Sequence, residues 1–427
     1  MRRVPRWWVT LLLLGFMLVN FADKALLGLV SKPLSEAFGL DAAGYGHVAS
    51  GFYFLFSLSA FGVGLLADRV PTRWLLLVLA VIWSVAQVPI IWTTSVAVLF
   101  TTRVVLGAAE GPAYGTANHA LHKWYDDEHR QLPTSILATG AAIGSVLAAP
   151  ILTWVIGHFG WRTGFAAVAL AGVVWCLLWL TVDGEGPVAA EAPASAPETP
   201  GGDVSYLRIF LSGTWLGTAL LGFAGYWGLA LTVAWLPRYL QDGLGYSVSA
   251  SGYLVALAWV VGGSLTFGTG ALSQWLTLRG APTRRSRGLL SAAMVAVGGV
   301  LPLVSVALPG RLGPLILVMT GLGAAGVVFA TGQTLSAEIS PPKRRGAVLG
   351  LNVAVATIAG VLAPTVTGDL VQAAADPLTG FSHAFVVFSV ICLVAAAVGA
   401  VVIRPQHDAA RLLSAPTNPH SQEGAAS

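Results

Sequence analysis

Long apolar runs separated by short polar segments dominate the chain. Twelve of these runs approach or exceed the length of about 20 residues that a helix needs to cross the hydrocarbon core of a bilayer. Because lipid offers no partners to backbone N–H and C=O groups, each run is predicted to form a transmembrane helix. The expected spans are roughly residues 7–30, 45–67, 74–92, 96–120, 135–156, 164–182, 210–236, 252–276, 288–308, 313–336, 346–371 and 383–403.

Two segments interrupt this pattern. Residues 183–203 are rich in Pro, Ala, Glu and Gly, a composition typical of a flexible linker, and the chain becomes polar again from Arg404 onward. The expected fold is therefore an all-α polytopic membrane protein with twelve transmembrane helices in two six-helix bundles. The predicted domains are an N-terminal bundle (1–182), a cytoplasmic linker (183–208), a C-terminal bundle (209–403) and a disordered cytoplasmic tail (404–427).

The composition agrees with a membrane protein. Charged residues make up 10% of the chain and the mean hydropathy is +0.76, whereas a soluble domain carries about 25% charged residues. A soluble protein of this kind would expose one continuous apolar surface. A soluble enzyme, a nucleic-acid binder, a disordered protein and a fibrous protein are therefore excluded. Cys176 and Cys392 both lie in apolar runs, which indicates buried packing residues and says nothing about a disulfide framework.

Basic residues predict the orientation in the membrane. If the N-terminus is cytoplasmic, 17 of the 23 Lys and Arg residues fall in cytoplasmic segments and 4 fall on the other side. This bias predicts that both termini are cytoplasmic. The expected location is the cell inner (cytoplasmic) membrane, with multiple spans. The net charge of +4 then reflects the basic residues that orient the chain in the membrane, and it does not indicate binding to nucleic acid.

Four ionisable residues lie inside predicted spans of the N-terminal half. Asp23 and Lys24 are in the first span, and Arg103 and Glu110 are in the fourth. The spacing of seven places Arg103 and Glu110 on one helical stripe together with Gly107. Spans 7 to 12 carry no charged residue well inside them. Because charges inside a membrane are costly, they usually mark a functional site.

Two interpretations of these charges remain open. In the first, a cation binds an anionic substrate and a carboxyl group carries a proton. Burial favours a neutral carboxylic acid and a nearby cation favours the ionised form. The arrival of substrate at Lys24 or Arg103 would then switch the protonation of Asp23 or Glu110. In the second interpretation, the four groups form a buried ion-pair network that locks spans 1 and 4 together.

Several sequence motifs occur in a characteristic order. The chain reads Gly-Leu-Leu-Ala-Asp-Arg-Val-Pro-Thr-Arg over residues 64–73 and Arg-Val-Val-Leu-Gly-Ala-Ala-Glu-Gly-Pro over 103–112. Further motifs are Gly-Trp-Arg at 160–162, Trp-Leu-Pro-Arg-Tyr at 235–239 and Arg-Gly at 345–346. This ordered set resembles the anion:cation symporter family of the major facilitator superfamily, which includes hexuronate, galactonate, glucarate, phthalate and sialic-acid carriers. The resemblance extends from Asn20 to about Phe385.

The resemblance implies proton-coupled uptake of organic anions by alternating access. By this resemblance Lys24 binds the substrate carboxylate, and Asp23 and Glu110 are the proton-coupling groups. Arg103 tunes Asp23 or assists binding. Lysine stands where the family more often has arginine, and it is a point charge without a bidentate fork. The site should therefore select the geometry of the carboxylate less strictly than the sites of relatives with arginine do.

The resemblance also implies a cytoplasmic gate after the second span. In the family, the acid of this loop pairs with basic residues and with a helix N-terminus, and so holds the cytoplasmic side shut. The corresponding residues here are Gly64, Asp68, Arg69 and Arg73. Pro71 replaces the usual second glycine of the motif.

Departures from the family pattern point to the character of the substrate. Phe56 and Ala60 stand where the family often has tyrosine and glutamine. We expect a site that is charged on one side and largely apolar on the other, suited to a carboxylate on an aromatic or short aliphatic body. Packing or interfacial anchoring is the alternative role for each aromatic residue. The expected substrate-binding residues are Lys24, Tyr53, Phe56, Arg103, Tyr226, Trp227, Gln333 and Asn352.

The favoured function is symport of a small organic anion with protons. The alternatives are a proton-coupled antiporter that exports an amphiphilic molecule and a receptor or scaffold that transports nothing. No nucleotide-binding P-loop motif occurs, and the GxGxxG match at 321–326 lies inside a predicted span, where close helix packing explains it. We expect a monomer with no enzyme activity, no cofactor, no metal and no nucleic-acid partner. The expected partners are the organic anion, protons and the lipid bilayer.

Overall fold

A computed structural model describes residues 5–67, 69–126, 129, 131–187, 205–341 and 344–413. Over these residues, twelve helices or runs of joined helices are long and apolar enough to cross a membrane. Their positions confirm the spans expected from the apolar runs. Several spans consist of two or more helical segments, because the regular α-helical geometry is interrupted within the span.

The N-terminal half contains ten helical segments in the described residues. They are α1 (Arg6–Leu29), α2 (Ser31–Phe38), α3 (Ala42–Phe54), α4 (Phe56–Leu66), α5 (Thr72–Gln87), η1 (Val88–Ile91), α6 (Val96–Glu110), α7 (Ala113–His122), α8 (Gln131–Phe159) and α9 (Trp161–Trp179). Here α3 and α4 form the second span, and α6 and α7 form the fourth.

The C-terminal half follows the linker. Its segments are α11 (Tyr206–Phe210), α12 (Gly213–Ala230), η2 (Leu231–Trp235), α13 (Leu236–Arg238), η3 (Tyr239–Gly243), α14 (Val248–Leu278), η4 (Arg284–Leu289), α15 (Leu290–Val306), α16 (Leu312–Gly326), α17 (Val328–Glu338), α18 (Arg345–Ala373), α19 (Pro377–Val402) and α20 (Pro405–Leu413). The segments α12 to η3 form the seventh span.

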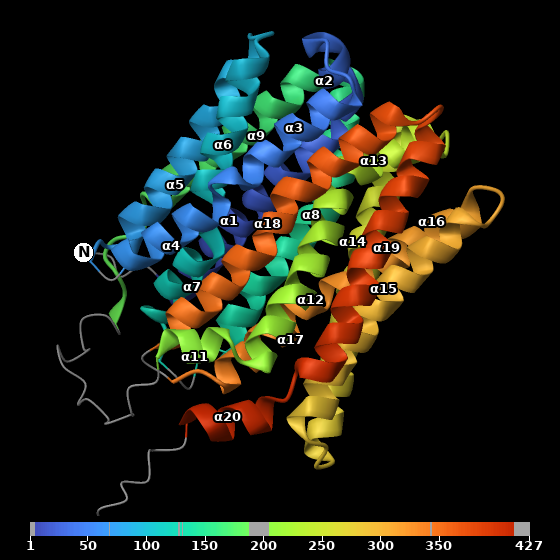
Figure 1. The fold of residues 1–427 in the computed structure, drawn as a ribbon. Coiled ribbons are helices and arrows are strands. Elements are labelled where there is room, and N and C mark those ends of the chain that lie inside the picture. Colours follow the sequence, from blue (N-terminus) through green and yellow to red (C-terminus); the bar gives the residue numbers. More distant parts are fainter. Residues whose placement is uncertain are drawn as a thin grey trace, which may run out of the picture.

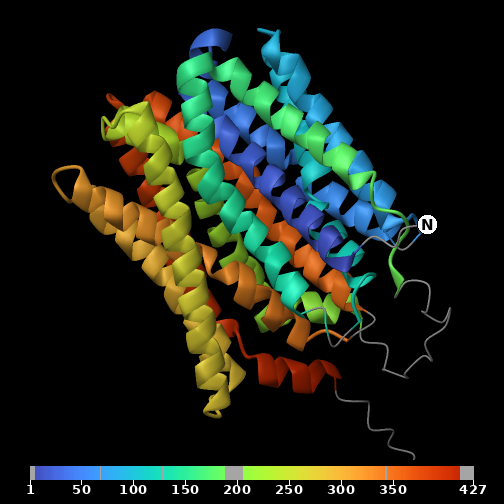
Figure 2. The ribbon, with the colours of Figure 1, turned by 180° about the vertical axis from the view of Figure 1, so that it is seen from behind.

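Each half is a bundle of six spans (Figure 1). In the first bundle α1 packs against α8 and α9, and α5 packs against α6 and α9. In the second, α12 packs against α18 and α19, and α15 packs against α16 and α19. The bundles meet along α3 and α18 and along α8 and α14, and Figure 2 shows the second of these pairs from behind. This arrangement confirms the predicted fold class.

The ends of the molecule are named here by their helices. The α2 face is the end at which α2 lies, and the linker face is the opposite end, where α11, α17 and α20 lie (Figure 1). At the α2 face the backbones of the two bundles approach closely at glycines. A Cβ on Gly28 would lie 2.0 Å from Val233 O, and one on Gly46 would lie 2.4 Å from Pro364 O. The bundles are therefore closed against each other at this face.

Polar contacts reinforce the closure at the α2 face. The Tyr45 hydroxyl donates to Ala234 O over 2.9 Å, and Ala42 N donates to Gln372 Oε1 over 3.1 Å. Lys32 Nζ lies 3.3 Å from Asp242 Oδ1. All three contacts join the first bundle to the second.

The seventh span is irregular where it contacts the first bundle. The π-helical turns η2 and η3 flank Pro237. Proline lacks the N–H that would normally bond to the carbonyl four residues earlier, which here is Val233. The absence of a side chain at Gly28 lets α1 approach that carbonyl. Pro237 thus leaves the Val233 carbonyl without its usual helical partner, and Gly28 lets α1 pack against it.

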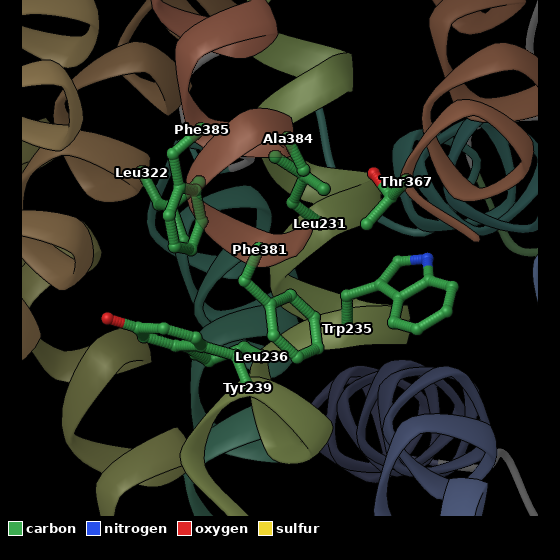
Figure 3. Close-up of a pocket in the computed structure, with 9 residues that line it drawn as sticks. All are labelled: Leu231, Trp235, Leu236, Tyr239, Leu322, Thr367, Phe381, Ala384 and Phe385. Atoms are coloured by element: carbon green, nitrogen blue, oxygen red, sulfur yellow. The ribbon is translucent and has the colours of Figure 1, made fainter. Parts of the chain in front are cut away.

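A small cavity lies inside the second bundle beside these π-helical turns. Figure 3 shows the rings of Tyr239, Phe381 and Phe385 around it. Its volume is about 10 Å³ and its lining is apolar, which is about the space of one water molecule. It is therefore too small to hold a transported molecule.

The tail corrects the sequence prediction in part. Residues 405–413, which were expected to be disordered, form helix α20 on the linker face. Asp408 Oδ2 accepts hydrogen bonds from Thr214 N over 2.8 Å and Thr214 Oγ1 over 2.6 Å, at the start of α12. Leu412 is buried in an apolar cluster with Trp215 and Ile339. Residues 414–427 lie outside the described part of the chain.

The beginning of the predicted linker is docked onto the first bundle. Glu185 accepts hydrogen bonds from Thr72 N and Arg73 N at the start of α5, each over 2.9 Å. Lys123 Nζ lies 2.7 Å from Glu185 Oε2. A carboxylate at a helix N-terminus satisfies free N–H groups and interacts favourably with the helix dipole. Residues 206–210, which run from the end of the predicted linker into the predicted C-terminal bundle, form α11, whereas residues 188–204 lie outside the described residues.

These contacts predict a pH-dependent contribution to stability. Burial raises the pKa of Glu185, but the hydrogen bonds from Lys123, Arg73 and Thr72 outweigh it and hold the pKa below its usual value of 4.5. A group with a lowered folded-state pKa stabilises the protein above its unfolded-state pKa and loses this contribution as the pH falls through the folded-state pKa. We therefore expect Glu185→Gln to lower the unfolding temperature at neutral pH and to lower it less below about pH 4.

Thermal unfolding in detergent across this pH range provides the measurement. Glu36→Gln is the matched control, because Glu36 is exposed on α2. If the unfolding temperatures of the wild type and Glu185→Gln differ by the same amount at every pH, the ionised Glu185 carboxylate does not cap α5.

Candidate functional site

Two helices of the first bundle bring the four charged residues of the spans together, and a third helix adds a neutral amide. Asp23 and Lys24 come from α1, and Arg103 and Glu110 come from α6. The last residue of α5, Gln87, lies between them and is completely buried. We call these five residues the charged cluster. The sequence predicted four of its members.

One part of the charged cluster is an ion pair between Lys24 and Glu110. Lys24 Nζ lies 3.0 Å from Glu110 Oε2 and also donates a hydrogen bond to Asn20 Oδ1. The Lys24 side chain is 14% exposed, whereas the Glu110 side chain is fully buried. Lys24 is therefore the cation of the cluster that a solute can reach.

The other part is a chain of three side chains. Gln87 Nε2 donates to Asp23 Oδ1, and Arg103 Nη2 donates to Gln87 Oε1 over 2.8 Å. Asp23 and Arg103 are each 1% exposed. The Arg103 guanidinium also lies 5.6 Å from the centre of the Phe165 ring. Arg103 is therefore sealed inside the bundle, and the structure does not place it where it could contact a solute directly.

Three carboxyl oxygens in the charged cluster are buried and make no hydrogen bond among the described contacts. They are Asp23 Oδ2 and both oxygens of Glu110, of which Oε2 is held in the ion pair with Lys24. The carboxyl groups of Asp23 and Glu110 interact electrostatically with each other, as well as with Lys24. Two carboxyl groups in one buried site readily share a proton, because ionising both brings like charges together. The cluster is chemically suited to hold and release protons.

Local packing explains how α6 presents Arg103 and Glu110 on one side. Gly107 lies between them, and a Cβ there would be 1.6 Å from Phe52 O on α3. The absence of a side chain thus lets α6 lie directly against α3. The helix ends at Glu110, where Gly111 and Pro112 follow and interrupt it.

This close approach yields a stability prediction. We expect Gly107→Ala to destabilise the protein by at least about 1–3 kcal/mol, because the added methyl group collides with the backbone of Phe52. Gly115→Ala is the matched control, since its Cβ would meet no atom within 4 Å in the same span. The control should gain about 0.5–1 kcal/mol from helix propensity. Thermal unfolding of both purified variants tests the contrast, and equal unfolding temperatures would refute it.

Aromatic rings surround the accessible lysine. Lys24 Nζ lies 4.5 Å from the centre of the Phe21 ring, 5.9 Å from that of Phe56 and 6.0 Å from that of Phe52. These distances suit cation–π contacts. Of the residues expected to bind substrate, the structure therefore places Phe56 beside Lys24.

The second bundle adds further aromatic groups near this position. Trp259 contacts Phe21 edge-on, with 6.4 Å between the ring centres. The hydroxyl groups of Tyr53 and Tyr226 lie near each other across the interface between the bundles, and Tyr53 also lies near Glu110. Tyr226 packs on Phe329 at 4.9 Å. The side that faces the charged cluster is thus aromatic, with two hydroxyl groups, and its role in binding a substrate stays a prediction.

Three other expected binding residues lie in different settings. Asn352 is buried between α18 and α12, where it donates to Thr218 Oγ1 over 3.1 Å, so its contacts are those of a packing residue. Gln333 is half-buried on α17. The described contacts join neither residue to the charged cluster. Trp227 is buried on α12, and its Nε1 has no hydrogen-bond partner among the described residues.

The predicted gate is only partly described. Asp68 lies outside the described residues. Arg73 Nη1 lies 3.7 Å from Asp183 Oδ1, so this arginine contacts the start of the linker. Gly64 is near the end of α4, and Arg69 lies in the turn that follows. The gating role of this group stays a prediction.

Sequence analysis missed two polar members of the site. Gln87 carries the one amide in the apolar run 74–92, two residues before Pro89, and Asn20 precedes Lys24 by one helical turn. Both amides could have been noticed in the sequence, because an amide inside a membrane span needs a hydrogen-bond partner. Both hydrogen-bond partners of Gln87 lie on other helices, so the sequence alone does not identify these partners.

Comparisons with known proteins agree with this architecture. The model of the family described as Major Facilitator Superfamily matches residues 12–364 and 314–422. The hexuronate transporter of Bacillus subtilis (strain 168) is 26% identical over 400 residues, covering 91% of this chain and 92% of that protein. The D-galactonate transporter of Escherichia coli O6:H1 is 23% identical over 419 residues, covering 92% and 94%.

Solved structures share the fold. A bacterial homolog of the human lysosomal transporter Spinster, in an inward-facing and unoccupied conformation, has a TM-score of 0.78 at 19% identity and covers 96% of this chain and 99% of its own. A D-xylose–proton symporter has a TM-score of 0.76 at 16% identity and covers 94% and 99%. At these identities the likeness concerns the fold alone.

Proposed function

Because this chain belongs to the major facilitator superfamily, a superfamily of multi-pass membrane transporters, we propose that it carries a small organic carboxylate together with protons. The observation that carries the proposal is the charged cluster: one accessible cation, Lys24, in direct contact with a buried acid, Glu110. Relatives named as hexuronate and D-galactonate transporters support an anionic substrate. They also agree with the resemblance to the anion:cation symporter family.

Charge balance supports coupling between the anion and the proton. When both acids are ionised, Asp23 and Glu110 balance Lys24 and Arg103, and the buried site is neutral. A carboxylate that binds beside Lys24 adds one negative charge, and protonation of one acid restores neutrality. Two unit charges about 4 Å apart interact by about 4 kcal/mol at an effective dielectric constant of about 20. This is large enough for each ligand to control the binding of the other.

The closed α2 face supports transport by alternating access. The Gly28, Gly46 and Tyr45 contacts hold the bundles together at that face. With the orientation predicted from the basic residues, the linker face is cytoplasmic and the α2 face lies outside the cell. The structure then corresponds to a state closed to the outside. The proposed location is the cell inner membrane, and the proposed form is a monomer.

Uptake into proteoliposomes tests the proposed function. A symporter accumulates the carboxylate inside vesicles when an inward proton gradient is imposed and loses this accumulation when a protonophore is added. Accumulation only with an opposed gradient would replace the proposal with the antiporter alternative. A protein that moves no compound in either direction, under conditions where it remains folded, would indicate a receptor or scaffold.

The surroundings of Lys24 support a substrate with an apolar body. Three phenylalanine rings lie within about 6 Å of its ammonium group, and they offer no hydrogen bonds to sugar hydroxyls. Besides Asn20 and Glu110, which contact Lys24 itself, the polar groups near this site in the described residues are the hydroxyl groups of Tyr53 and Tyr226. We propose that a single carboxylate on an aromatic or short aliphatic body fits this site better than a sugar acid does.

Competition between two radiolabelled acids tests this preference. We expect benzoate to be taken up with a KM about fivefold lower than that of glucuronate, since an aromatic contact with the rings contributes about 1 kcal/mol. Phe56→Tyr should narrow this difference by adding a hydroxyl group beside Lys24. Preferred uptake of glucuronate by the wild type would refute the apolar substrate without affecting the proposed proton coupling.

A further inference from the structure

The charged cluster contains a group to which neither the sequence nor the comparisons assign a role. We infer that Gln87 is a positioning residue that transmits the effect of Arg103 to Asp23 and thereby assigns the Asp23 proton to the Oδ2 atom. This inference rests on the proposed function only in taking Asp23 as a proton-coupling group. Its basis is the chain of hydrogen bonds from Arg103 through Gln87 to Asp23.

The orientation of the Gln87 amide follows from the chemistry of arginine. A guanidinium group has five N–H donors and no acceptor. Because Arg103 Nη2 lies 2.8 Å from the amide of Gln87, the atom that faces it must be the carbonyl oxygen, Oε1. The opposite orientation would bring two donors together. The Nε2 amide group is therefore turned toward Asp23.

The same constraint then passes to Asp23. The Gln87 Nε2 group only donates, so Asp23 Oδ1 must accept a hydrogen bond and cannot carry the proton toward Gln87. The remaining oxygen, Oδ2, is buried and has no hydrogen-bond partner among the described residues. A proton on Asp23 therefore belongs on Oδ2, and Gln87 stabilises the ionised form by one charge-assisted hydrogen bond.

The other charged groups around Asp23 do not fix this orientation. Lys24 on α1 and Arg103 on α6 interact electrostatically with Asp23, and the carboxyl group of Glu110 lies within hydrogen-bonding reach of it, but the donor to Oδ1 in the described contacts is Gln87. Tyr45 is a further ionisable group that interacts with Arg103. Arg103 donates to the amide of Gln87 and not to the carboxyl group of Asp23. Its orienting effect is thus indirect.

The position of Gln87 at a helix end makes the amide rigid. It is the last residue of α5, and the 3₁₀ turn η1 with Pro89 follows directly. Since Pro89 lacks an N–H, the regular helix cannot continue unchanged through this point. The side chain is 0% exposed, so the amide has no water to which it could turn.

A direct test follows the protonation of Asp23 without requiring a substrate. Infrared spectroscopy of the full-length protein in lipid nanodiscs can titrate the protonated carboxyl band that disappears in Asp23→Asn. We expect Gln87→Met, which keeps the length of the side chain, to move the midpoint of this titration by about one to two pH units toward higher pH. This is the size expected for the loss of one hydrogen bond to a charged group.

Further variants separate positioning from a structural role. Gln87→Glu should move the midpoint in the same direction, because an ionised carboxylate can accept from Arg103 but cannot donate to Asp23. Gln372→Met is the matched control, since this amide accepts a hydrogen bond from Ala42 N at the α2 face. It should leave the Asp23 midpoint unchanged even if it lowers the unfolding temperature.

The outcomes discriminate clearly. Shifts in both Gln87 variants with an unchanged control support the inference. If the Gln87 variants lower the unfolding temperature but leave the Asp23 midpoint where it is in the wild type, Gln87 is a packing residue and the inference fails. Proton-driven uptake by the wild type would still stand in that case, because the failure would concern only the route from Arg103 to Asp23.

Discussion

Replacing Lys24 with alanine should abolish specific uptake of the carboxylate. Lys24 is the accessible cation of the charged cluster, and its ammonium group lies 3.0 Å from Glu110. Loss of a hydrogen bond to a charged group costs about 1.5–3 kcal/mol, which corresponds to a roughly 10- to 200-fold lower affinity. Thermal shift of the purified variant with benzoate or glucuronate measures this binding directly, and proteoliposome uptake measures its consequence.

Lys24→Arg is the matched control, because it keeps the positive charge on a longer side chain. It should retain binding and become stricter about carboxylate geometry, since a guanidinium group forms two parallel hydrogen bonds. Full binding by Lys24→Ala would remove the lysine from the substrate site. It would leave the alternative of a buried ion-pair network that only joins α1 to α6.

Glu110→Gln should separate exchange from proton-driven accumulation. The amide mimics a permanently protonated acid, so the variant should still exchange labelled for unlabelled carboxylate across the membrane. It should lose at least about tenfold in accumulation driven by an inward proton gradient, because the group can no longer release a proton. The two rates are measured on the same proteoliposomes, with and without the gradient.

Glu338→Gln serves as a control for the loss of an acid elsewhere. Glu338 pairs with Arg287 at 3.6 Å in the second bundle, away from the charged cluster. Its replacement should leave the ratio of driven uptake to exchange unchanged. Driven accumulation by Glu110→Gln at the wild-type level would exclude Glu110 from proton coupling, and Asp23 would then be the remaining acid of the cluster.

The spans and the charged residues could be predicted because the membrane enforces simple rules. A run of about 20 apolar residues must be helical in lipid, so the twelve spans follow from length and composition. A charge inside such a run is rare enough to stand out, which identified Asp23, Lys24, Arg103 and Glu110. Their association in one cluster was also foreseeable in part, because Arg103 and Glu110 share a stripe of one helix.

Other members of the site could not be predicted in this way. Gln87 is a single neutral amide, and its importance depends on Asp23 and Arg103, which come from two other helices. Asn352 was expected at the substrate site but packs against α12, because the direction of a side chain on a helix depends on how the helix is rotated in the bundle. Glu185 and Asp408 lie in segments with linker-like composition, yet both cap helices distant in sequence.

By itself, the sequence determined that this chain is a helical membrane protein in two halves, and that the charged residues inside its membrane spans are concentrated in the first half. Those properties depend on the free energy of transferring each residue from water to lipid, which is set by the residue and its neighbours in the sequence. Only the tertiary structure decided which face is closed, which cation a solute can reach and which amide stands between Arg103 and Asp23. These depend on the rotation and contact of helices, where glycines such as Gly28 and Gly107 let backbones meet and side chains from distant segments complete each other's hydrogen bonds.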